Sequence, residues 1–135
     1  MRRNLSIVIV AVVVALGARA VPVWAHHSFS AEFDVKKPIK FRGTLTKMEW
    51  VNPHAWLHID VMTEDGKTEE WMVETAAPNS LLRRGYTKKS LPIGAEILIE
   101  GFQARDGSNK ANGSSITFAD GKRLFVGGGT DSVTR

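Results

Sequence analysis

Residues 54–61 alternate strictly between two kinds of side chain. Aliphatic residues fill every second position, and polar or aromatic residues fill the others: Ala55, Leu57, Ile59 and Val61 against His54, Trp56, His58 and Asp60. A period of two is typical of a half-buried β-strand, with the aliphatic side facing a core. The opposite side carries a tryptophan between two histidines, where a plain solvent-facing strand has small or charged residues. This outer face is therefore the first candidate binding surface.

The rest of the chain predicts further strands around this one. Strands are expected at residues 39–50, from 54, at 69–75, 96–104, 115–118 and 123–126, with a short helix at 78–85 between the third and fourth strands. The apolar positions of 39–50 change sides after Leu45, which predicts a β-bulge, and Gly43 suits a strongly bent strand. The order of elements predicts an all-β, OB-fold-like antiparallel barrel, closed or partly open. The alternative is an unrelated small antiparallel barrel or sandwich.

The first 25 residues predict a secretory signal peptide. Two arginines precede an apolar stretch at residues 5–16, and small residues stand at the −3 and −1 positions of a cleavage site after Ala25. The alternative is a retained membrane anchor, but Arg19 and Pro22 interrupt the run of about 20 apolar residues that a span requires. We therefore expect a periplasmic or secreted bacterial protein with no stable membrane anchor after cleavage.

Charge and cysteine content exclude several classes of function. After the leader, 15 Lys and Arg residues face 14 Asp and Glu residues, so the high overall pI does not indicate a nucleic-acid partner. The chain contains no cysteine, which excludes thiol chemistry and thiolate metal sites. No nucleophile elbow, phosphate loop or zinc-protease helix occurs, so we expect no catalysis.

Two flanking segments complete the expected organisation. Residues 26–37 predict an extended N-terminal arm that ends at Pro38, and residues 38–126 the barrel domain. Residues 127–135 predict a disordered tail.

Several segments together resemble a family of small exported bacterial proteins that is catalogued as a domain of unknown function. The segments are Ala25-His26-His27-Ser28-Phe29, residues 49–56 around Trp50-Val51-Asn52-Pro53-His54, residues 77–85 from Ala77-Pro78-Asn79 to Gly85, residues 106–109 and residues 111–113. The resemblance covers essentially the whole chain after the leader. It implies an exported, barrel-like domain and brings no established activity or catalytic residues.

The histidines suggest a metal site. Cleavage after Ala25 would make His26 the first residue, and its amine and imidazole could then chelate one ion, with His27 offering a second route. A further imidazole would complete a nitrogen site of the kind that copper(II) prefers. His54 is the predicted third ligand, because His58 lies about 13 Å farther along a strand. The alternatives are a solvated N-terminus, a structural His54 bonded to a carbonyl, and an exposed His58.

The aromatic residues suggest a separate binding site. Trp56 on the outer face either stacks on a ligand or is covered, and the arm with Phe29 and Phe33 is the expected cover. Trp50 and Trp71 are expected in the core, and Trp50 is also a peripheral ligand candidate.

Arg84 is the last candidate. It is a peripheral ligand candidate, although a cation at a helix end is also favoured by the helix dipole. The expected function is a non-catalytic binding module for a small molecule, glycan or protein of the cell envelope, acting as a monomer through His54, Trp56, Trp50 and Arg84. The alternative is a copper-binding protein that uses His26, His27 and His54.

Overall fold

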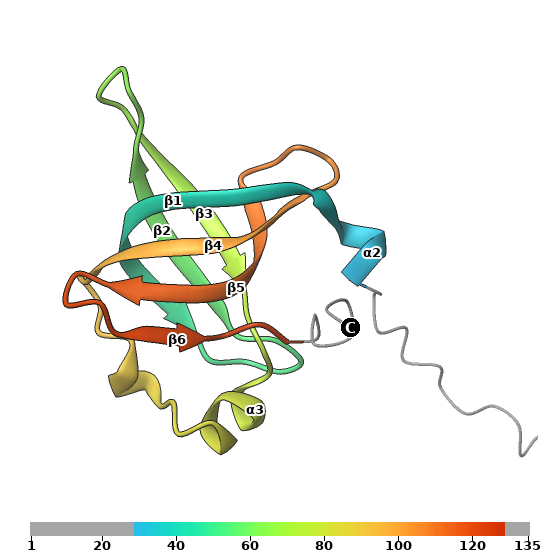
Figure 1. The fold of residues 1–135 in the computed structure, drawn as a ribbon, viewed down its shortest axis with the longest axis vertical. Coiled ribbons are helices and arrows are strands. Elements are labelled where there is room, and N and C mark those ends of the chain that lie inside the picture. Colours follow the sequence, from blue (N-terminus) through green and yellow to red (C-terminus); the bar gives the residue numbers. More distant parts are fainter. Residues whose placement is uncertain (1–28, 129–135) are drawn as a thin grey trace, which may run out of the picture.

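The computed structural model describes residues 29–128 (Figure 1). The elements follow in the order α2 (Phe29–Glu32), β1 (Phe33–Glu49), β2 (Trp56–Met62), β3 (Thr68–Glu74), α3 (Pro78–Arg83), η1 (Lys88–Ser90), β4 (Glu96–Ala104), β5 (Lys110–Phe118) and β6 (Arg123–Phe125). Within these residues, no helix has the length and apolar character needed to cross a membrane.

Five of the strands close into a ring. The sheet runs in the order β3-β2-β1-β4-β5-β6, and a parallel pairing between β3 and β5 joins its two sides. The other pairings of the described strands are antiparallel. The sheet is therefore barrel-like, with the short helix between β3 and β4, and the predicted OB-fold-like class is confirmed.

The bend that closes the ring lies in β1. Its pairing with β2 shifts register between Leu45 and Lys47, which confirms the predicted β-bulge. Gly43 lies just before it, where a Cβ atom would come within 2.5 Å of the Ile59 side chain and 2.7 Å of the Asp60 carbonyl oxygen. Glycine therefore lets β1 pass close over β2 at the sharpest part of the bend.

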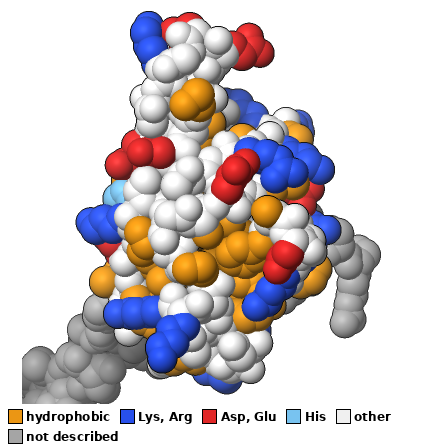
Figure 2. Space-filling view, turned by 90° about the vertical axis from the view of Figure 1, so that its left-hand side faces the viewer, with side chains coloured by type: hydrophobic (Ala, Val, Ile, Leu, Met, Phe, Trp, Pro, Cys, Tyr) orange, Lys and Arg blue, Asp and Glu red, His pale blue; other side chains and the backbone are white. Residues whose placement is uncertain are grey.

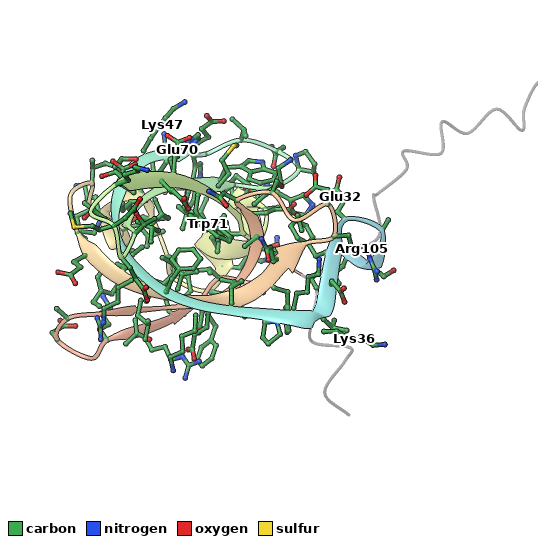
Figure 3. The ribbon with its side chains drawn as sticks, turned by 90° about the horizontal axis from the view of Figure 1, so that it is seen from above. Glu32, Lys36, Lys47, Glu70, Trp71 and Arg105 are labelled. Atoms are coloured by element: carbon green, nitrogen blue, oxygen red, sulfur yellow. The ribbon has the colours of Figure 1, made fainter. Side chains whose placement is uncertain are left out.

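The core fills the inside of the ring. Fully buried aliphatic side chains come from every strand of the ring and from the segments beside it, among them Leu45, Leu57, Ile59, Val73, Leu81, Leu91, Ile97, Ile99 and Ile116. Trp71 lies inside the ring (Figure 3), with its ring centroid 4.7 Å from that of Phe41. The predicted aliphatic face of β2 therefore faces the core, and each fully buried Leu or Ile side chain contributes about 1.5–3 kcal/mol.

The N-terminal arm is shorter than predicted. Residues 33–37 belong to β1, because Phe33 is buried and pairs with Ala104. The β1–β4 register shifts between Phe33 and Pro38, and this irregularity accommodates a proline inside the strand. Residues 29–32 form a helical turn, whose end accepts a hydrogen bond at the Glu32 carbonyl from the Arg105 amide at 2.9 Å (Figure 3).

Strand β5 begins at Lys110, five residues before the predicted start at Ser115. Asn112 and Gly113 have a loop-like composition, but the chain here pairs with β3 on one side and β4 on the other. Because this segment pairs with a strand on each of its edges, it forms a strand despite its loop-like composition.

Candidate functional site

His54 is held by one nitrogen of its ring. Its Nδ1 lies 3.1 Å from the Thr75 carbonyl oxygen and 3.4 Å from a carboxylate oxygen of Glu74. Both neighbours are acceptors, so in the neutral ring Nδ1 is the nitrogen that carries the proton. The side chain is 36% exposed, and no described residue bonds Nε2. The ring is therefore fixed in orientation with one nitrogen available.

Two buried polar side chains lie beside this ring. Glu74 is buried and pairs across the sheet with Trp56 on one side and Asn112 on the other. Paired residues point to the same face, so these three side chains share the outer face of the ring. The Oδ1 atom of Asn112 is buried and has no hydrogen-bond partner among the described residues. A buried acceptor without a partner is uncommon in folded proteins and sets this part of the face apart.

Trp56 is half-buried at the start of β2. The ammonium group of Lys110 lies 5.9 Å from its ring centroid, in cation–π range. Phe29, which was expected to cover Trp56, instead contacts Phe33 and packs edge-on against Phe102 of β4. Among the described residues, the group found over Trp56 is therefore a lysine, and part of the Trp56 side chain stays accessible.

His58 differs from His54 because both of its ring nitrogens have partners. Nδ1 lies 3.1 Å from Glu70 and Nε2 lies 3.1 Å from Glu49. The expectation of an exposed residue is wrong: β1 and β3 place a glutamate on each side, and the residue is 9% exposed. His58 is thus a structural residue that ties β2 to its neighbours.

The family comparison agrees with the resemblance seen in the sequence. The family of unknown function DUF6152 matches residues 13–114, which is most of the chain. The chain belongs to this family. Searches of curated proteins and of solved structures gave no match. Membership in the family assigns no activity, so the function is inferred from the geometry of the site.

Four further residues were predicted for the site, and the structure describes two of them, Trp50 and Arg84. His26 and His27 lie outside the described residues. The guanidinium of Arg84 donates to the carbonyl oxygens of Phe125 and Gly127 at 3.1 and 2.9 Å, which fastens the end of β6 to α3. Trp50 packs partly on the core and lines a surface hollow with Leu82. Among the described residues, no three His, Asp or Glu side chains form a group that could hold a metal.

The sequence did not predict Glu74 and Asn112 as site residues. The position of Glu74 could have been predicted from the β2–β3 hairpin. The two residues of every β2–β3 pair lie equally far from Asp65 in the sequence, as Trp56 and Glu74 do, and His58 and Met72. Extending that symmetry from the Asp65-Gly66 turn would have placed Glu74 beside Trp56. Asn112 gave no such signal, because its partner strand is parallel and distant in sequence.

The carboxylate network predicts how stability depends on pH. The Lys47 ammonium, and next the His58 ring, hold the pKa of Glu49 below its ordinary value. Hydrogen bonds and nearby cations likewise lower the pKa values of Asp65, Glu100 and Asp106. A depressed folded-state pKa gives stability that is present above the unfolded value and lost as the pH falls through the folded value.

We therefore expect the free energy of unfolding to fall steadily from about pH 5 to about pH 3. Glu49→Gln should make this fall shallower, whereas Glu64→Gln, at an exposed position of the β2–β3 turn, should leave the slope unchanged. Urea titrations at a series of pH values measure both slopes. Equal slopes for wild type and Glu49→Gln would show that Glu49 has no part in the acid response.

Proposed function

We propose that the protein is an exported, non-catalytic binding module whose ligand sits at the His54–Trp56 end of the outer face of β2. One observation carries the proposal: His54 is locked through Nδ1 while no described residue bonds its Nε2, beside an accessible tryptophan. Farther along the same strand, His58 is buried and paired on both sides, so the open part of the face is its His54–Trp56 end. The leader supports export, and the ligand class is a small molecule, glycan or protein segment of the cell envelope.

The polar groups around Trp56 suit a ligand with donors and a flat or apolar face. Trp56 offers part of its ring for stacking, with Lys110 beside it. The side-chain oxygen of Asn112 accepts a hydrogen bond without loss of an existing one. A ligand that stacks on Trp56 would lie next to Glu74 and Asn112, the buried polar side chains of the same face.

Tryptophan fluorescence tests this site. Titration with peptidoglycan fragments or soluble glycans should quench the emission of the chain, and Trp56→Ala should abolish the quenching. Trp71→Phe is the matched control, because its ring faces the inside and its loss should leave the titration curve in place. Quenching that survives in Trp56→Ala, or that disappears in Trp71→Phe, would remove Trp56 from the binding site.

A second candidate function is copper(II) binding, and a specific contact favours it. Metal-binding histidines usually donate their second ring nitrogen to a carbonyl or carboxylate, which fixes the tautomer and aims the other nitrogen at the metal. His54 has both kinds of acceptor at Nδ1, namely Thr75 and Glu74. His26 and His27 would supply the amine and the remaining imidazole, and copper(II) is the ion that such nitrogen donors favour.

A further inference from the structure

The segment around α3 and η1 carries only positive charges. Between Glu74 and Glu96 the sequence has four basic residues, Arg83, Arg84, Lys88 and Lys89, and no acidic residue. Arg84 is engaged with backbone carbonyls, whereas Lys88 and Lys89 are exposed and form no ion pair with any described residue. The lysines therefore present uncompensated charge to solvent.

Apolar side chains are exposed beside these lysines. One hollow is lined by Trp50, Leu82, Thr87, Lys88 and Lys89, and an adjoining one by Thr46, Lys47, Met48, Lys88, Leu91, Pro92 and Ile93. Lys88 borders both. Leu82 is 48% exposed and Ile93 is 59% exposed. Figure 2 shows a hydrophobic area on one face of the molecule, bordered by both basic and acidic side chains.

We propose that the Lys88 surface, formed by Met48, Trp50, Leu82, Lys88, Lys89 and Ile93, docks reversibly on an anionic lipid membrane. Lysines next to an exposed leucine, an exposed isoleucine and a half-buried tryptophan match the two layers of a bilayer surface, which are charged headgroups over hydrocarbon. An anionic polysaccharide would use the lysines but would leave the aliphatic side chains in water. The proposal concerns a surface separate from the His54 site and does not depend on its ligand.

Two single-cysteine variants test which surface touches the membrane. The chain has no cysteine, so Leu82→Cys carries one environment-sensitive fluorophore at the Lys88 surface. Met62→Cys carries it at the β2–β3 hairpin, at the opposite end of the molecule in Figure 1, where Met62 is 75% exposed. On phosphatidylglycerol vesicles the Leu82 label should brighten and shift to the blue, and the Met62 label should stay unchanged. Phosphatidylcholine vesicles should give no response, and a salt concentration of about 0.5 M should reduce the response by screening.

A charge-reversal pair tests the electrostatic part. Lys88→Glu/Lys89→Glu should weaken partitioning of the Leu82-labelled chain by at least about tenfold, because each lysine near an anionic surface contributes to the attraction and each glutamate opposes it. The matched control is Lys36→Glu/Lys37→Glu on β1, where Lys36 points away from the ring (Figure 3), and it should change partitioning far less.

Three results would overturn the proposal. They are an equal response of the two labels, equal loss in the two charge-reversal pairs, and binding to soluble polyglutamate without any response on vesicles. The last result would assign the surface to an acidic protein partner. Membrane contact by another segment would bind the chain to vesicles without a selective response of the Leu82 label, and would be recognised in this way.

Discussion

Gly101→Ala is expected to destabilise the fold more than alanine at any other glycine of residues 29–128. A Cβ atom at Gly101 would lie 2.1 Å from the Asn112 carbonyl oxygen and 3.1 Å from the Gly113 Cα atom. Both contacts are with the backbone of the neighbouring strand, which cannot rotate away as a side chain can. The register shift between Glu100 and Gly101 brings β4 and β5 this close. We expect a loss of about 3 kcal/mol or more in the free energy of unfolding.

The control for Gly101→Ala separates a clash from a backbone preference. Gly66 has a φ of +78° and no atom within 4 Å of an added Cβ atom, so Gly66→Ala should cost only about 1–2 kcal/mol for the left-handed conformation. Urea unfolding followed by circular dichroism compares the two variants. If Gly101→Ala costs no more than Gly66→Ala, the strands are not held as closely as the structure places them.

The closeness of β4 and β5 also bears on the site. Asn112 supplies both the backbone carbonyl that Gly101 accommodates and the buried side-chain oxygen that lacks a partner among the described residues. A side chain at Gly101 would push β5 outward and move Asn112 relative to Glu74, with which it pairs. Binding at the His54–Trp56 end should therefore weaken in any Gly101 variant that still folds.

The sequence predicted the fold well where the signal was local. The side change of apolar residues after Leu45 depends only on the alternation within one strand, and the structure has the bulge there. Helix α3 likewise follows from Pro78 at its start and from Gly85, which has a φ of +82° just beyond its end. The bulge and the helix ends depend on residues that are close in sequence, so a single sequence is sufficient to predict them.

The site was harder to predict because it depends on pairing between distant segments. Alternation placed His58 on the outer face but gave no information about Glu49 and Glu70, which turn an exposed position into a buried one. The polar composition around Asn112 predicts a loop, and its burial results from strands on both sides. The alternation of side chains along a strand determines which face of the sheet a residue occupies. The pairing register with the adjacent strands determines which residues lie next to it.

The copper hypothesis gives the second large prediction. The structure distinguishes the proposed ligand, His54, from the residues that hold its ring, Thr75 and Glu74. The described chain begins at Phe29, whose ring packs on Phe102, and Phe102 pairs with Asn112, which pairs with Glu74 beside His54. Neighbouring strands lie about 4.8 Å apart, so the two steps from Phe102 to Glu74 cover about 10 Å. The 5.9 Å between the rings of Phe29 and Phe102 and the 3.4 Å from Glu74 to His54 add to this path. The three residues from Phe29 back to His26 span about 10 Å when extended. An extended segment of this length covers the two strand steps but not the whole path, so the titration decides whether the terminal amine shares an ion with His54.

Copper(II) titrated into the processed chain, with its N-terminus verified by mass spectrometry, should bind with a Kd below the micromolar range. Glu74→Gln should weaken binding by about 10–100-fold, because the carboxylate helps to hold the ring of His54. His54→Gln should weaken it at least as much and should remove one nitrogen from the hyperfine pattern in electron paramagnetic resonance. His58→Gln should leave the affinity unchanged, since both of its ring nitrogens are already engaged. One extra residue before His26 should weaken binding by breaking the terminal chelate, and equal binding with and without that residue would exclude the terminal-histidine site.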